Sequence, residues 1–252
     1  FLSDDVLIKI SVSSTNSEDV ISSSAKVRDY IEKFNNQNKN SRLEVLSDAS
    51  DTLNGRNRLL IENIFQGRNI SASIRSADCF GIQDVHIIEN DNIFNDDSEV
   101  SMGAEKWICT HRYNEEKHNT IAAIKDLKSQ GYQIVVTTPH NTNCNLDDID
   151  VNKKTALLFG SEVHGCSDDA LKYADKLMRI PSYGFTESFN VSVSVSLCLH
   201  HLTHKLRKST INWQLTLDEQ NNILLKWLRN SIKASKEIEE KYLSKNTKKT
   251  NV

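Results

Sequence analysis

The chain alternates short apolar runs with longer segments in which apolar residues recur at helical spacing. The apolar runs predict strands over residues 58–64, 85–88, 108–113, 133–137, 155–159 and 176–180. Helical spacing predicts helices over residues 70–80, 117–130, 167–173 and 190–208. Because strands and helices follow one another in turn, the sequence predicts an α/β fold, with helices on both faces of a parallel sheet. On this pattern alone, the core is an ordinary Rossmann-like domain.

The predicted core, residues 58–208, lies between two extensions. Residues 1–57 form an N-terminal extension rich in Asn and Ser, with one predicted helix over residues 25–34. Residues 209–252 form a C-terminal helical, basic extension, in which a long helix is predicted over residues 218–243 and its packing side chains include Ile223, Trp227 and Ile232. Residues 205–252 carry a charge balance of +6, whereas residues 1–204 carry −9. A basic terminus on an acidic body is typical of nucleic-acid binding, although a solvated helix with a Lys-rich tail has the same composition.

Composition argues against several classes of protein. The chain has 252 residues, of which 38% are hydrophobic and 26% charged, as in soluble globular proteins. No apolar run approaches the ~20 residues of a membrane span, and the absence of a Gly-x-Gly-x-x-Gly or Walker loop argues against a dinucleotide or nucleoside triphosphate enzyme. Five scattered cysteines favour a reducing compartment. We expect a cytoplasmic protein, or an organellar one if the chain derives from a longer precursor, since it does not begin with Met.

One histidine pair has the spacing of a metal site. His200 and His204 lie four residues apart on a predicted helix, as zinc ligands often do. The segment is Leu-rich and offers no obvious Cys or carboxylate ligand, so we expect ordinary helix histidines and no metal.

The segment over residues 180–193 places small and polar groups where a strand passes into a helix. Pro181 ends the strand because it has no backbone N–H to donate, and Gly184 supplies a flexible corner. Ser188 or Asn190 then caps a helix whose first backbone N–H groups are free to bind a ligand or an anion. Taken alone, the pattern also fits a buried helix that binds nothing.

Two further polar segments follow predicted strands. Gly160 and Gly165 bracket Glu162 in a short loop, which lets the backbone approach a ligand and aims one carboxylate at it. A helix of small residues carries Asn69 near its start and Arg75 nearly two turns later. A lone Arg on a helix is usually solvated or ion-paired, but its Ser, Ala and Ile neighbours lead us to expect that Arg75 faces inward.

The three segments resemble the motifs of the SPOUT-class RNA ribose 2′-O-methyltransferases, specifically the TrmH-like branch. That family carries an Asn-x-x-Ala-x-x-Arg segment, a Gly-x-Glu-x-x-Gly segment and an Ile-Pro…Gly…Ser-x-Asn-Val-Ser-Val segment, in this order. The resemblance extends over residues 59–206, with Arg68 in place of a frequent His and Cys166 in place of a frequent Leu. The matching residues are Asn69, Ala72, Arg75, Gly160, Glu162, Gly165, Ile180, Pro181, Gly184, Ser188, Asn190, Val191, Ser192 and Val193.

The resemblance implies a C-terminal deep trefoil knot, a homodimer, S-adenosyl-L-methionine (SAM) as cofactor and RNA as substrate. In the family, Arg75 is proposed to act as a base. A guanidinium is effectively always protonated, however, so a phosphate clamp is the safer role. The implied catalytic residues are Arg75, Asn69, Ser188, Glu162 and Asn190. The implied cofactor-binding residues are Gly160, Glu162, Gly165, Ile180, Pro181, Ser188, Asn190 and Val191.

The resemblance also orders the candidate substrates. It is strongest to members that methylate guanosine 18 in the tRNA D-loop, so tRNA is our first expectation. Ribosomal RNA and the tRNA wobble-position ribose are alternatives within the same chemistry. A catalytically silent knotted RNA-binding protein, and an α/β enzyme that binds a nucleotide without RNA, are alternatives of other classes. We expect neither a metal nor a membrane as a partner.

Overall fold

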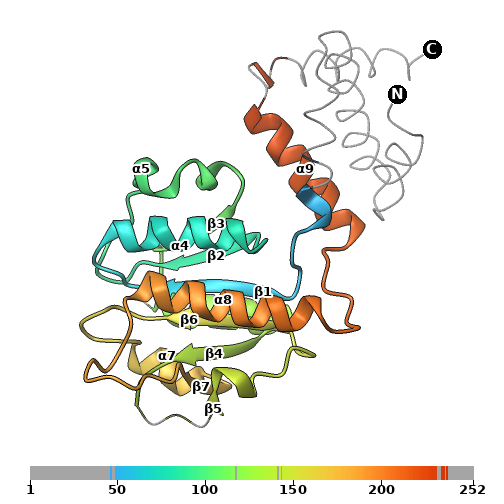
Figure 1. Cartoon of the computed structure of the whole chain (residues 1–252). Coiled ribbons are helices and arrows are strands. Elements are labelled where there is room, and N and C mark those ends of the chain that lie inside the picture. Colours follow the sequence, from blue (N-terminus) through green and yellow to red (C-terminus); the bar gives the residue numbers. More distant parts are fainter. Residues whose placement is uncertain are drawn as a thin grey trace, which may run out of the picture. The chain divides into compact units, whose positions relative to one another are not determined.

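The structure is a computed structural model that describes residues 46, 49–116, 118–140, 142, 144–231, 234, 235 and 237 (Figure 1). The chain divides into two compact units, which are described separately. One unit is Asn54–Trp213, and the other combines Phe1–Leu53 with Gln214–Val252. Within the part of the chain that the structure describes, no helix has both the length and the apolar character needed to cross a membrane.

The unit Asn54–Trp213 is built on a seven-stranded parallel sheet, in the order β3-β2-β1-β6-β4-β7-β5. In its centre, Leu59 of β1 pairs with Val85 of β2 on one side and with Leu157 of β6 on the other. Both central strands are buried throughout, as expected for parallel strands covered on two faces. The strands are β1 (Asn57–Glu62), β2 (Asp84–Ile88), β3 (Cys109–Tyr113), β4 (Gln133–Thr137), β5 (Cys144–Asn145), β6 (Thr155–Phe159) and β7 (Lys176–Arg179).

Helices cover both faces of this sheet, which confirms the predicted layers (Figure 1). Successive strand residues point to opposite faces. Leu59 therefore packs in the core under α4 and α8, whereas Leu60 packs in the core under α6 and α7. The helices are α4 (Gly67–Cys79), α5 (Ser98–Ser101), α6 (Asn119–Ser129), α7 (Asp168–Tyr173) and α8 (Val191–Arg207), with 3-10 helices η1 (Ala104–Lys106) and η2 (Leu146–Asp148).

The observed bounds stay close to the predicted ones. The strands predicted over residues 133–137 and 155–159 have the bounds of β4 and β6. β1 ends at Glu62, because Asn63 takes a positive φ of 53° that a strand does not accommodate. The sequence does not predict β5, since two residues outside any apolar run carry no strand signal.

In the second unit, α9 (Leu217–Ser231) begins where the predicted long helix begins. Ile223 and Trp227 are buried, as predicted. Glu219 accepts hydrogen bonds from the backbone N–H and hydroxyl of Thr216 at 2.8 and 2.7 Å, which caps the helix start. The predicted helix over residues 25–34, residue Ile232 and most positions of the predicted helix beyond Ser231 lie outside the described residues.

A buried polar cluster lies on β2 and β3, near one edge of the sheet. His86 is 3% exposed, and its Nδ1 lies 3.0 Å from the hydroxyl of Tyr113, which donates to Asp126 Oδ2 at 2.8 Å. Because the only proton of that hydroxyl goes to Asp126, Nδ1 of His86 is the donor toward Tyr113. Burial lowers the pKa of His86 to about 3, so this ring is neutral near pH 7.

Candidate active site

The polar segments found in the sequence lie at the carboxyl edge of the sheet. α4 follows β1, the Gly160 loop follows β6, and Ile180 and Pro181 follow β7. The strands β1, β6, β4 and β7 are successive neighbours in a parallel sheet, so their carboxyl ends share one edge. Ligands of open α/β sheets bind outside this edge. The fold therefore gathers all three segments at a place suited to a ligand.

Asn69 connects the three segments. Its Nδ2 donates a hydrogen bond to Glu162 Oε1, and its Oδ1 accepts one from Asn190 Nδ2 at 3.2 Å. Asn190 in turn caps α8, as predicted, by accepting the backbone N–H of Ser192 at 2.9 Å. We name the group Asn69, Glu162 and Asn190 the Asn69 junction. Its contacts join positions 93 and 121 residues apart in the chain.

The loop between Gly160 and Gly165 is a closed turn. The backbone N–H groups of Ser161 and Gly165 each donate to the other residue's carbonyl at 2.9 Å. A Cβ on Gly160 would lie 2.3 Å from the backbone N of Cys166 and the carbonyl of Gly165, so only glycine allows this closure. Gly165 has a positive φ of 70°, which also favours glycine. The turn leaves Glu162 exposed at its tip.

The segment between β7 and α8 is the most exposed part of the site. Tyr183 and Phe185 are 96% and 109% exposed, and Ser188 is also exposed. Among the described residues, the hydroxyl of Ser188 has no hydrogen-bond partner, so no direct bond ties it to the Asn69 junction. Val191, at the first turn of α8, is buried at 7% exposure and fixes the helix start against the core.

The inward orientation expected for Arg75 is wrong. Arg75 is exposed on α4, and its guanidinium forms no hydrogen bond or ion pair with any other residue that the structure describes. The helical period explains the difference, because the buried face of α4 passes through Ile74 and Ala77 and leaves position 75 outside. Arg75 is therefore free to meet a ligand or a second chain.

A buried carboxylate that the sequence did not predict, Glu62, supports the chain next to the site. Glu62, at the end of β1, is 1% exposed and accepts hydrogen bonds from the hydroxyl of Thr120 at 2.5 Å and from Ser167 N and Oγ at 2.9 and 2.6 Å. Ser167 caps α7, so Glu62 fixes the chain just after the Gly160 loop. Burial, with the charge of Glu62, raises the pKa of the Cys166 thiol well above its usual range, and the thiol donates to the carbonyl of Thr137 at 3.3 Å. An acidic residue closing an apolar strand is the signal that could have found Glu62.

The site offers a carboxylate, amide groups and exposed backbone for hydrogen bonding. No three His, Cys, Asp or Glu side chains in the described ranges are grouped to hold a metal ion. His200 and His204, the pair that has the spacing of zinc ligands in the sequence, stack their rings on α8 with centroids 5.9 Å apart.

The fold and the site define an α/β protein whose ligand site is built from three loops at the carboxyl edge of a parallel sheet. Residues 56–200, more than half of the chain, match the SpoU rRNA Methylase family. The chain belongs to this family.

Several relatives are similar over most of their length. The chain is 38% identical over 204 residues to a tRNA (guanosine(18)-2′-O)-methyltransferase of Borreliella burgdorferi, covering 81% of this chain and 90% of the relative. It is 30% identical over 173 residues to the Thermus thermophilus protein of the same description, covering 68% and 87%.

Solved structures share the fold. The Aquifex aeolicus TrmH/SpoU tRNA modifying enzyme superposes with a TM-score of 0.69 at 24% identity, covering 77% of this chain and 98% of that one. The SpoU methyltransferase AviRb from Streptomyces viridochromogenes, in complex with AdoMet, gives 0.55 at 22% identity, covering 64% and 65%. At these identities the likeness establishes the fold alone.

Proposed function

We propose that this chain transfers the methyl group of SAM to the ribose 2′-hydroxyl of guanosine 18 in tRNA. Membership of the SpoU family and the identity to the Borreliella burgdorferi enzyme support this reaction and substrate. The single observation that carries the proposal is the Asn69 junction, which joins one residue from each of the three motif segments at the carboxyl edge of the sheet.

The loops after β6 and β7 fit SAM. A Cβ on Gly165 or Gly184 would meet no atom within 4 Å, so the backbone at both glycines is open to a ligand. Glu162 adds a carboxylate suited to a positively charged ligand. SAM, when bound, supplies a methyl group on a positively charged sulfur that an oxygen nucleophile can displace. The residues that we assign to holding it are Gly160, Glu162, Gly165, Ile180, Pro181, Ser188, Asn190 and Val191.

Catalysis requires that a weak nucleophile be aligned and lose its proton. We assign Arg75 to the RNA phosphate beside the reacting ribose, because a guanidinium binds phosphate through two parallel hydrogen bonds and keeps its charge. Asn69, Glu162 and Asn190 hold the loops together around the reacting groups. We assign the hydroxyl of Ser188, which is exposed, to the same site.

A homodimer and a trefoil knot complete the proposal. Ala72 and Ser76 of α4 line a shallow cavity of about 370 Å³ with Val193 and Leu197 of α8. Val193 and Leu197 stay 45% and 39% exposed, so a second copy of the chain could bury them. This surface lies on the same helix as Arg75, which supports an active site completed across two chains. The knot and the cytoplasmic location stay predictions.

The proposal is tested with tRNA transcripts that differ at one atom. The purified chain and SAM should methylate a transcript carrying guanosine 18 and leave one carrying 2′-deoxyguanosine 18 unmodified. Asn69→Ala should abolish transfer. Methylation mapped to ribosomal RNA or to the wobble ribose instead would assign the alternative substrates. Binding of tRNA without any methyl transfer would favour the catalytically silent alternative.

A further inference from the structure

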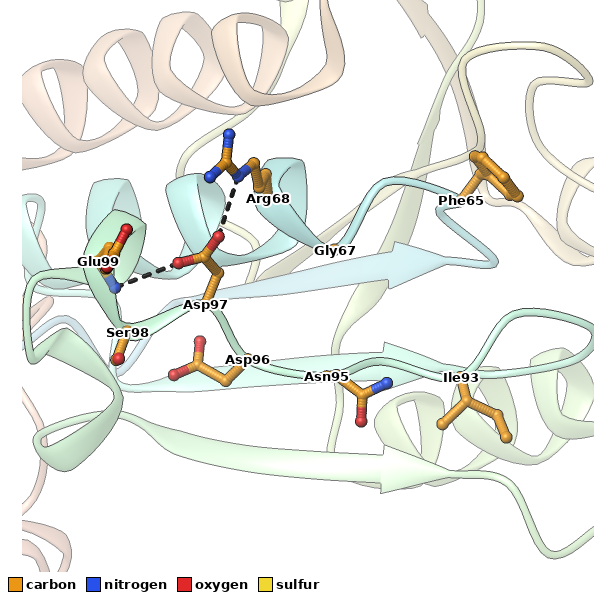
Figure 2. Close-up of a pocket in the computed structure, with 9 residues that line it drawn as sticks. All are labelled: Phe65, Gly67, Arg68, Ile93, Asn95, Asp96, Asp97, Ser98 and Glu99. Atoms are coloured by element: carbon orange, nitrogen blue, oxygen red, sulfur yellow. Dashed lines mark hydrogen bonds and ion pairs between the residues drawn. The ribbon is translucent and has the colours of Figure 1, made fainter.

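A groove of about 590 Å³ opens beside the first turn of α4 (Figure 2). One wall is the loop leading into α4, and the other is the segment that follows β2. Phe65 and Ile93 lie at the same end of the groove, one on each wall, and each is 77% exposed. Exposed aromatic and aliphatic side chains on two walls are suited to stacking a flat ring.

The rest of the groove is acidic. Asp96, Asp97 and Glu99 line it together with one cation, Arg68, which is paired with Asp97 at 3.0 Å. A surplus of carboxylates repels a phosphate backbone and accepts hydrogen bonds from N–H groups. The occupant that this chemistry fits has a flat face and N–H donors on its edge, which describes a nucleobase.

Asp96 is an acceptor held in a fixed position. Its Oδ1 accepts the hydroxyl of Ser71 at 2.9 Å, and the same hydroxyl oxygen accepts the backbone N–H of Asp97 at 2.9 Å. The hydroxyl of Ser101 lies 3.5 Å from its Oδ2, which is long for a hydrogen bond, and donates its proton to Glu105 Oε2 at 2.7 Å instead. Asp96 therefore keeps free acceptor capacity on a carboxylate whose orientation is set by α4.

The wall that carries Ile93 and Asp96 is also anchored. The backbone N–H of Phe94 donates to Glu89 Oε1 at 2.7 Å, and Arg112 donates to the carbonyl of Phe94 at 3.0 Å. Arg112 also binds both carboxylate oxygens of Glu89. Burial alone would raise the pKa of Glu89, but these bonds hold it below its ordinary value, so the anchor stays charged. A preformed wall loses little entropy when a ligand binds.

The groove and Arg75 lie along one side of α4. Arg68 and Arg75 are seven residues apart, which places them within about 20° around the helix and about 10.5 Å along it. A nucleotide can therefore lie with its base in the groove and its ribose and phosphate toward Arg75.

We propose that this groove binds the base of the nucleotide to be methylated, and that Asp96 reads the N1–H and 2-amino groups of guanine. The inference rests on the proposed function and adds the means of base selection. Guanine presents two adjacent donors on its Watson–Crick edge, whereas adenine, cytosine and uracil present one donor beside acceptors. A carboxylate with two acceptor oxygens matches guanine alone.

The test compares transcripts that carry guanosine or inosine at the target position, since inosine lacks the 2-amino group. Wild-type kcat/KM should be ~10-fold or more higher for guanosine. Asp96→Asn should bring the ratio of the two values close to one. Asp168→Asn makes the same chemical change on α7, across the sheet, and should keep the wild-type ratio. Phe65→Ala, at an exposed position, should raise KM ~5-fold or more for both transcripts and keep the ratio.

Each of these measurements has an outcome that would overturn the inference. Equal wild-type activity on both transcripts, an unchanged ratio in folded Asp96→Asn, or an unchanged KM in Phe65→Ala overturns it while leaving the proposed function intact. A wild-type chain that methylates neither transcript overturns the proposed function and this inference together.

Discussion

At the scale of single residues, substitution of Arg75 is the most direct test of the mechanism. Arg75→Ala should lower the rate of methyl transfer ~1,000-fold or more, because an aligned, charged contact to the reacting nucleotide is lost. SAM affinity, measured by calorimetry, should stay nearly unchanged, since Arg75 lies on a different segment from the SAM loops. Lys125→Ala removes an equal charge from α6, on the other face of the sheet, and should leave the rate unchanged. Near-normal turnover by Arg75→Ala would remove Arg75 from the mechanism.

The substitution Gly160→Ala tests the SAM loop through a steric clash, without changing any charge or hydrogen-bonding group. Gly160→Ala places a methyl group 2.3 Å from backbone atoms of Gly165 and Cys166, so the turn must open. We expect SAM affinity to fall ~10-fold or more and the chain to lose about 1–3 kcal/mol of stability. Gly184→Ala, whose Cβ would meet no atom within 4 Å, is the matched control for stability. Wild-type SAM affinity in Gly160→Ala would separate this loop from the cofactor.

At the scale of elements, α4 and α8 carry the expected contact between two chains. Leu197→Asp places a charge on the exposed apolar surface and should convert a dimer into a monomer in sedimentation, with methyl transfer lost. Met102→Asp adds the same charge at a 67% exposed position, where the left-handed backbone tolerates Asp, and should stay dimeric. A dimer that survives Leu197→Asp would place the interface elsewhere.

The sequence predicts elements better than it predicts their contacts. β4 and β6 are readable because a strand buried on both faces leaves a continuous apolar run. The two-residue β5 leaves none. The motif residues are readable by resemblance, but the bonds from Asn69 to Glu162 and Asn190 are not, since they depend on how distant segments meet. The orientation of Arg75 depends on which side of α4 packs inward, and the spacing of Ile70, Ile74 and Ala77 could have predicted that side, because these residues form one apolar stripe that leaves position 75 outside.

At the scale of the whole molecule, the buried cluster around His86 should make stability depend on pH. The unfolded ring takes up a proton near pH 6.5, whereas the folded ring does so only near pH 3, so stability is lost as the pH falls below about 6.5. The loss should reach about 2 kcal/mol by pH 5. Asp84 acts in the same direction at lower pH. Burial alone raises its pKa, but the hydrogen bond from His111 and the charge of Arg58 lower it overall.

Urea unfolding between pH 5 and 7.5 measures this slope. His86→Asn keeps a donor toward Tyr113 without titrating, so its stability should vary much less with pH than that of the wild type. His164→Asn changes an exposed histidine of the Gly160 loop and should keep the wild-type slope. A wild-type slope in His86→Asn would assign the pH dependence to other groups.

The basic C-terminal extension should contribute to RNA binding through electrostatic attraction to phosphates, which depends on the charge of its Lys side chains and not on their exact geometry. Replacing Lys245, Lys248 and Lys249 with Gln should weaken tRNA binding and reduce the slope of log Kd against log salt by up to about 2 to 3. Replacing the same residues with Arg preserves the charge and should preserve the slope. Fluorescence titrations from 50 to 200 mM salt would measure both. An unchanged slope in the Gln variant would place the phosphate contacts on other residues.

The Asn69 junction also determines how late in synthesis the site can form. Its members are contributed by positions 69, 162 and 190, so a nascent chain that has emerged only as far as β6 holds the first of them and lacks the other two. Contacts of such long sequence separation form late, after the intervening chain has closed its loops. An N-terminal fragment can therefore build much of the sheet before it can bind cofactor. Binding of SAM should therefore require that synthesis has passed Asn190.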